Sequence, residues 1–143
     1  MEIVNSDNIH SGNTIMVDTD IFSYWIKGDT RGDPFYPYSI SKKVALSFAS
    51  VAELYYWEYN KNWGRELITR LEQKISECVM LPSSNDVCRE FSMIRFQLKN
   101  KPIGYLDYWI AACARSYKCP ILTNNYSHFS GIEGIKLLGP YSN

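Results

Sequence analysis

Four acidic side chains stand at positions where carboxylates can do chemistry. Asp18 and Asp20 directly follow the apolar residues 15–17 in "TIMVDTDIFSYWI". Glu53 lies in "LSFASVAELYYW", and Asp107 lies in "KPIGYLDYWIAACA". A carboxylate is costly to bury unless it is paired or binds a cation. Carboxylates gathered at one place repel one another, and a divalent metal ion relieves that repulsion.

Each of these acids also has a purely structural explanation. Asp18 or Asp20 is suited to cap the helix that follows, since Asp is a preferred N-cap residue. Ser50 and Glu53 match the S-x-x-E capping box, in which the glutamate reaches back to the serine N–H. Asp107 stands in the first turn of a predicted helix, where the macrodipole favours a negative charge. A metal-binding site therefore requires that the fold bring these carboxylates close to one another.

Short apolar segments alternate with helical patterns along the chain. The expected strands cover residues 15–17, 43–48, 78–82, 120–125 and 135–139. The expected helices cover residues 21–26, 50–60, 63–75, 84–98 and 105–117, and residues 27–38, rich in Gly, Pro and Asp, are expected to form a loop. This alternation predicts an α/β fold, a three-layer α/β/α sandwich with a central parallel sheet of four to five strands.

The predicted fold places the candidate residues at one edge of the sheet. Ligands of parallel α/β folds bind at the carboxyl ends of the strands. Asp18 follows the first strand, and Thr123 and Asn125 close the fourth. If Glu53 and Asp107 converge on the same edge, oxygen ligands with few His suit Mg²⁺ or Mn²⁺. A metal ion there activates water and neutralises charge on a phosphate, which suits hydrolysis of a phosphodiester.

The composition narrows the remaining possibilities. The chain has 143 residues and zero formal net charge. It therefore lacks the overall basic charge that would by itself indicate a nucleic-acid-binding domain. We expect one domain over residues 14–143, preceded by a polar extension over residues 1–13. The four cysteines are scattered without a C-x-x-C pair, which indicates core residues of a reduced, cytoplasmic protein rather than a zinc site. We expect neither a signal peptide in residues 1–14, which are polar, nor a membrane-spanning segment.

Taken together, these segments resemble the PIN-domain ribonucleases, and in particular the VapC-type toxins of bacterial type II toxin–antitoxin systems. The stretches that carry the resemblance are "MVDTDIFSYWIKG", "LSFASVAELYYW", "KPIGYLDYWIAACARSYKCPILTNNYSHF" and "IEGIKLLGP". They occur in the family order and cover most of residues 14–140. The resemblance implies a metal-dependent endoribonuclease with Mg²⁺ or Mn²⁺ as cofactor. It also implies an RNA substrate, a cognate antitoxin protein as partner, and a homodimer.

The resemblance also implies a role for each candidate residue. Asp18 and Asp107 match metal ligands of the family, and Glu53 matches a further acid of the active site. Asn125 is expected to take part in catalysis by orienting water or substrate. Thr123, two residues before it, supports the same turn.

Asp20 stands where the family usually has Asn or Ser, and with Ser50 it is expected to support the site. The chain departs from the family pattern at one place, which is the turn after the fourth expected strand. His128 stands where many relatives have Asp or Glu, so a fourth acid is missing or replaced and occupancy by a second metal ion is in doubt. His128 is expected to hold a water molecule or contact RNA phosphate, or to be an ordinary surface histidine.

Two other functions remain open. A PIN-like protein without its fourth acid is a candidate RNA-binding or protein-binding module with weakened catalysis. The D-x-D sequence of Asp18 and Asp20 after a first strand is also typical of phosphatases that use an aspartate nucleophile. Those enzymes need a later pair of acids, whereas here the fourth strand leads into Thr-Asn-Asn.

Overall fold

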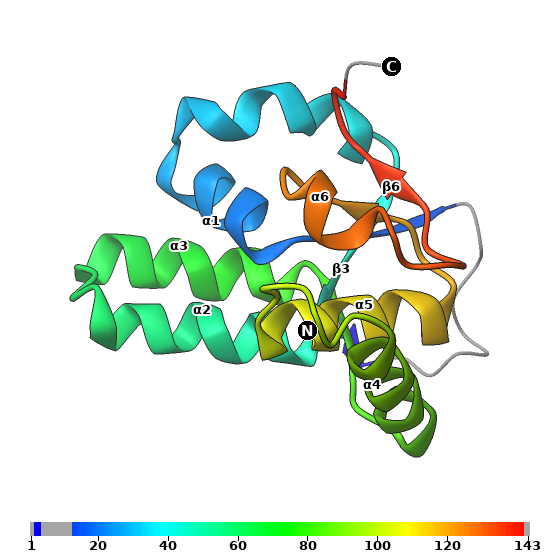
Figure 1. Cartoon of the computed structure of the whole chain (residues 1–143). Coiled ribbons are helices and arrows are strands. Elements are labelled where there is room, and N and C mark those ends of the chain that lie inside the picture. Colours follow the sequence, from blue (N-terminus) through cyan, green and yellow to red (C-terminus); the bar gives the residue numbers. More distant parts are fainter. Residues whose placement is uncertain (1, 4–12, 142–143) are drawn as a thin grey trace.

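A parallel β-sheet lies between two layers of helices in the computed structural model, which describes residues 2–3 and 13–141 (Figure 1). The six strands within these residues have the order β1-β4-β3-β2-β5-β6. Their bounds are β1 (Glu2–Ile3), β2 (Thr14–Val17), β3 (Lys43–Ser47), β4 (Val79–Leu81), β5 (Ile121–Leu122) and β6 (Leu137–Leu138). The helices are α1 (Thr19–Lys27), the 3₁₀ helix η2 (Thr30–Ser39), α2 (Phe48–Asn60), α3 (Arg65–Ser76), α4 (Asn85–Gln97), α5 (Tyr105–Tyr117) and α6 (Tyr126–Phe129).

Strand β2 lies where the order of the strands reverses. The chain passes from β2 to β3 and β4 on one side, and later to β5 and β6 on the other. Met16 of β2 is therefore in register with Ala45 of β3 and with Ile121 of β5. The carboxyl ends of β2 and β5 meet at this reversal, which is the usual ligand-binding position of a parallel sheet.

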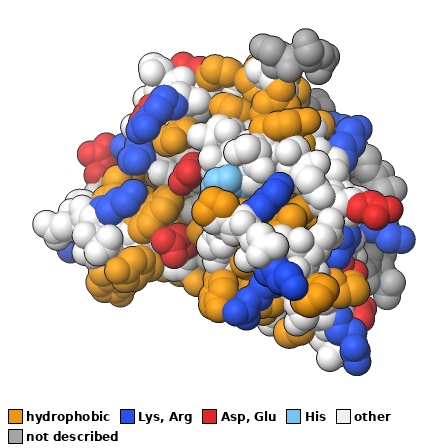
Figure 2. All heavy atoms as spheres, viewed as in Figure 1, with side chains coloured by type: hydrophobic (Ala, Val, Ile, Leu, Met, Phe, Trp, Pro, Cys, Tyr) orange, Lys and Arg blue, Asp and Glu red, His pale blue; other side chains and the backbone are white. Residues whose placement is uncertain are grey.

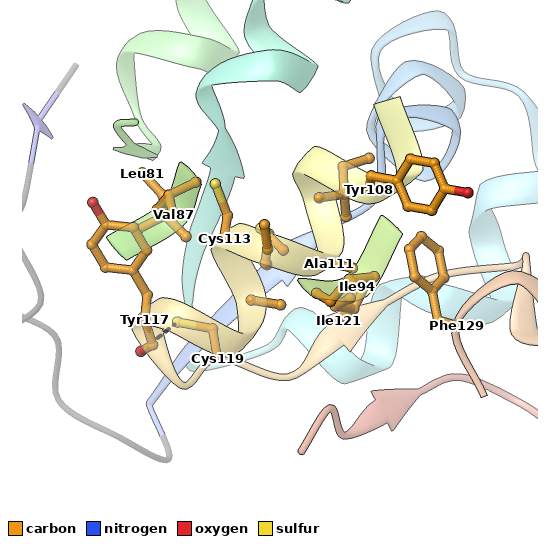
Figure 3. Packing of buried hydrophobic residues seen from close by; sticks show 14 of the residues in the cluster. Leu81, Val87, Ile94, Tyr108, Ala111, Cys113, Tyr117, Cys119, Ile121 and Phe129 are labelled. Atoms are coloured by element: carbon orange, nitrogen blue, oxygen red, sulfur yellow. Dashed lines mark hydrogen bonds between the residues drawn. The ribbon is translucent and has the colours of Figure 1, made fainter. Parts of the chain in front are cut away.

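Alternate side chains of the sheet enter two hydrophobic cores. Met16 packs with α4 and α5 on one face, in the cluster shown in Figure 3. Ile15 and Val17 pack with α1, α2 and α3 on the other face. Burial on both faces explains why the strands are continuous apolar runs. The predicted α/β/α sandwich with a parallel sheet is confirmed.

Three of the four cysteines are core residues, as their sequence contexts indicate, whereas Cys88 of α4 is exposed and the prediction is wrong for it. All four are free thiols, and Cys78, Cys113 and Cys119 are buried. Burial raises the pKa of each of these three thiols to about 11, so they stay protonated at neutral pH. None of the described helices has the length and apolar character needed to cross a membrane.

Three local predictions differ from the structure. Most of residues 27–38 are 3₁₀ helical, because η2 packs on α1 and the Trp25 Nε1–H donates to the carbonyl oxygen of Gly32 at 2.9 Å. Helix α2 begins at Phe48 and is capped by Ser47, whose hydroxyl accepts from the Ala49 N–H. Ser50 is therefore inside the helix, and the predicted capping box does not form.

The sheet also has one strand more than the sequence analysis expects. Glu2 and Ile3 form β1, which pairs in parallel with β4 at the edge of the sheet. A two-residue strand is too short for its periodicity to be seen in a sequence. The rest of the expected polar extension, apart from Asn13, lies outside the described residues.

Candidate active site

Asp18 occupies the point where β2 ends and α1 begins. Its side chain is 3% exposed. One carboxylate oxygen caps α1 by accepting from the Thr19 N–H at 2.8 Å. The other oxygen accepts from the Thr123 hydroxyl at 2.6 Å, across the boundary between β2 and β5. Asp18 is thus both the helix cap that its residue type favours and a buried acid at the strand reversal.

The surroundings of Asp18 make its ionisation costly. Burial, together with the nearby charges of Asp107 and Asp20, raises the pKa of its carboxyl group to about 6. The hydrogen bonds from Thr123 and Thr19 act in the opposite direction, because they stabilise the charged form. Near neutral pH this carboxylate is a desolvated negative charge next to other acids, which is an environment that favours a bound cation.

Asp107 lies in the first turn of α5 and pairs with His128 of α6. The His128 Nδ1 atom is 2.7 Å from Asp107 Oδ2. Burial raises the pKa of Asp107, Asp20 raises it further, and His128 lowers it. The histidine that replaces the expected fourth acid therefore contacts an acid of the candidate site, and it is not an isolated surface residue.

The turn after β5 is built around Thr123. Its side chain is fully buried, and its hydroxyl oxygen accepts from the Asn125 backbone N–H at 2.9 Å while it donates to Asp18. The Asn125 side-chain amide approaches the same Asp18 oxygen at 3.5 Å, the long limit of a hydrogen bond. Both residues predicted for this turn are therefore beside Asp18.

Helix α2 contributes Ser50 and Glu53 from one face. Ser50 is buried and accepts a hydrogen bond from the Thr19 hydroxyl at 2.8 Å, which ties α2 to the start of α1. Glu53 lies one turn further on, and residues three apart share a helix face. Glu53 is half-buried and forms no hydrogen bond or ion pair with any described residue. The structure thus links Asp18, Asp20 and Asp107 electrostatically, while Glu53 has no direct contact with them.

The acids fit a divalent ion that keeps part of its water shell. Across residues 2–3 and 13–141, no three His, Cys, Asp or Glu side chains already gather into a complete metal site. Mg²⁺ is usually bound through one or two carboxylates and retains several waters. Asp18 and Asp107 could supply this number of ligands, and burial together with neighbouring acids raises the pKa of each.

Replacing Thr123 with Val should make Asp18 harder to ionise, since the isosteric side chain cannot donate a hydrogen bond. We expect the pKa of Asp18 to rise beyond about 6 and Mn²⁺ binding near that pH to weaken by roughly tenfold. A carbon-13 NMR titration of the carboxyl groups and calorimetry with Mn²⁺ measure both effects. Thr123→Ser keeps the hydroxyl and should behave as wild type. An unchanged Asp18 pKa in Thr123→Val would show that the Thr123 hydrogen bond does not stabilise the ionised carboxylate.

Tyr141 belongs to this region, although the sequence analysis does not single it out. Its hydroxyl donates toward the carbonyl oxygens of Thr123 and Leu138. Burial raises the pKa of Tyr141, and the nearby negative charge of Asp18 raises it further. Tyr141 follows β6 in the sequence without any periodic pattern, so only the sheet order brings it here.

Comparisons with known proteins find solved structures of similar fold. A chain of FitAcB from Neisseria gonorrhoeae is 26% identical, with a TM-score of 0.74, covering 88% of this chain and 97% of that one. A chain of VapBC2 from Rickettsia felis, solved with a DNA fragment from their promoter, is 23% identical, with a TM-score of 0.75, covering 87% and 97%.

A more distant likeness concerns Mycobacterium tuberculosis VapC20, described as a Sarcin-Ricin loop cleaving toxin. It is 16% identical, with a TM-score of 0.63, covering 85% of this chain and 98% of that one. No curated protein matches at the significance required. The PIN domain family model matches residues 15–134, which include every site residue predicted from the sequence. The chain therefore belongs to the PIN-domain family.

Proposed function

We propose that this protein is a metal-dependent endoribonuclease that hydrolyses RNA phosphodiester bonds and acts as the toxin of a toxin–antitoxin pair. The observation that carries the proposal is the buried Asp18 carboxylate, held by Thr123 at the strand reversal and electrostatically coupled to Asp107. The similar structures described as VapBC2 and as a Sarcin-Ricin loop cleaving toxin support the same function. Membership of the PIN family argues against the aspartate-nucleophile phosphatase.

In this proposal each residue has a distinct task. Asp18 and Asp107 hold Mg²⁺ or Mn²⁺, which when bound supplies positive charge against the phosphate and lowers the pKa of water. Thr123 keeps the Asp18 carboxylate oriented and ionised. Asn125 donates its amide to substrate or water beside Asp18. Glu53, which has no partner among the described residues, orients the attacking water from the α2 side.

The proposal is tested with protein purified free of any antitoxin and incubated with total RNA. Reactions contain Mg²⁺, Mn²⁺ or EDTA, with Asp107→Asn beside wild type. We expect discrete RNA fragments that require metal and are lost in the variant. Wild-type protein that neither cleaves RNA nor binds Mn²⁺ in calorimetry would overturn the proposal and leave the alternative, an RNA-binding or protein-binding module.

His128 is expected to hold Asp107 in position for the metal. Groups that orient a metal ligand typically contribute about 10- to 100-fold to metal affinity, so His128→Ala should weaken Mn²⁺ binding by this factor. Calorimetry at neutral pH measures it, and His128→Asp tests whether an acid at this position supports binding. Unaltered affinity in His128→Ala would make the 2.7 Å contact irrelevant to the metal.

The proposed partner is a cognate antitoxin protein, because this chain is similar in fold to chains of VapBC structures, a family described as toxin–antitoxin systems. We also propose that the toxin pairs as a homodimer. Co-expression of the chain with the product of the adjacent reading frame, followed by size-exclusion chromatography with light scattering, tests both points. A stable complex should form and should suppress the RNA cleavage described above.

A further inference from the structure

Two tyrosine rings lie together at the edge of the candidate active site. Tyr126 begins α6, directly after Asn125, and its side chain is 51% exposed. The ring of Tyr141 packs against it with a centroid distance of 4.8 Å and an angle of 58° between the ring planes. On the face shown in Figure 2, hydrophobic side chains lie beside acidic side chains and a histidine in the region that α6 occupies in Figure 1.

Tyr141 is held firmly enough to support its neighbour. Its hydroxyl contacts the carbonyl oxygen of Thr123 and lies 2.9 Å from that of Leu138. Its ring packs so closely on Gly139 that a Cβ atom there would be 2.6 Å from the tyrosine Cζ. Burial raises the pKa of Tyr141 to about 12, so the hydroxyl remains a donor at neutral pH.

The same contacts connect the rings to the candidate catalytic groups. The residue whose carbonyl oxygen Tyr141 contacts is Thr123, and the hydroxyl of Thr123 donates to Asp18 at 2.6 Å. That hydroxyl also accepts from the backbone N–H of Asn125, the residue before Tyr126. The exposed Tyr126 therefore directly follows Asn125, whose side-chain amide reaches toward Asp18.

We propose that Tyr126, supported by Tyr141, is a stacking platform for an unpaired base of the RNA substrate next to the scissile phosphate. This inference rests on the proposed ribonuclease function and adds a substrate class to it. Aromatic side chains bind bases of single strands by stacking, largely independently of sequence. Bases inside an RNA helix are already stacked on one another, so the platform selects loops and other single-stranded regions.

Preorganisation explains why the second ring matters. A side chain that is ordered before binding loses less conformational entropy when it meets its ligand. Tyr126 is exposed and yet packed on an anchored ring, whereas Tyr59 at the end of α2 is 83% exposed and has no ring contact with any described residue. Tyr59 is therefore a matched surface tyrosine for comparison.

The test measures fluorescence anisotropy of short, random-sequence, single-stranded RNA labelled with fluorescein. Asp18→Asn is the background, so that the RNA is not cut. Tyr126→Ala should weaken binding by on the order of tenfold, whereas Tyr126→Phe and Tyr59→Ala should bind as the background does. With an abasic strand, the background protein and its Tyr126→Ala variant should bind with equal affinity. Thermal melting verifies that each variant is folded.

The outcomes separate this inference from the proposed function. If Tyr126→Ala binds single-stranded RNA as tightly as the background while the native-sequence protein cleaves RNA, the platform is wrong and the ribonuclease function stands. If Tyr126→Ala loses only the antitoxin in co-purification, the ring serves a protein partner and the platform is again wrong. If the native-sequence protein does not cleave RNA at all, the proposed function fails first.

Discussion

Replacing Asp18 with Asn should reduce RNA cleavage by about a hundredfold or more without unfolding the protein. Asn keeps the size of the side chain and is an equally good N-cap residue, so α1 should begin at the same place. The variant lacks the buried negative charge that is coupled to Asp107, and the loss of one such electrostatic group at an active site typically has an effect of this size. The rate at which each protein cleaves total RNA under single-turnover conditions measures this reduction.

A surface acid provides the control for this experiment. Asp86 lies in the first turn of α4 and is exposed, so Asp86→Asn makes the same chemical change away from the site. We expect this variant to cleave at the wild-type rate. Cleavage by Asp18→Asn at a rate close to that of Asp86→Asn would show that the buried carboxylate is not part of the catalytic machinery.

Asp18→Asn should also increase the stability of the metal-free protein at neutral pH. The pKa of Asp18 is about 6 in the folded state and 3.8 for an unperturbed side chain. The folded state therefore binds the proton more tightly, so this group stabilises the fold below about pH 4. That stabilisation is lost as the pH rises through about 6. At pH 7 the loss amounts to about 3 kcal/mol, which Asn, having no charge, avoids.

Urea unfolding in EDTA at a series of pH values measures this effect. The difference in unfolding free energy between Asp18→Asn and wild type should grow from pH 4 and level off above about pH 7. Asp107, whose pKa is also raised, is present in both proteins, so its own contribution largely cancels. Mn²⁺ should reduce the difference, because it stabilises the form of the wild-type protein that binds it. A difference independent of pH would contradict the raised pKa.

The fold class and the position of Asp18 at the end of a strand could be predicted from local sequence patterns. Apolar runs of strand length, separated by helical periodicity, indicated a parallel sheet between helices. A carboxylate directly after such a run has to lie at the carboxyl end of a strand, which identified Asp18. These inferences succeeded because they depend on neighbouring residues only, and periodicity records which side chains are buried.

The contacts between side chains of the candidate site could be seen only in the three-dimensional structure. Thr123 donates to Asp18 across 105 residues of chain, and His128 pairs with Asp107 across 21. Contacts of this kind depend on the strand order, with β5 beside β2, and on the packing of helices, neither of which leaves a trace in local periodicity. The sheet order likewise brings Tyr141 to the site, where its side chain supports Tyr126.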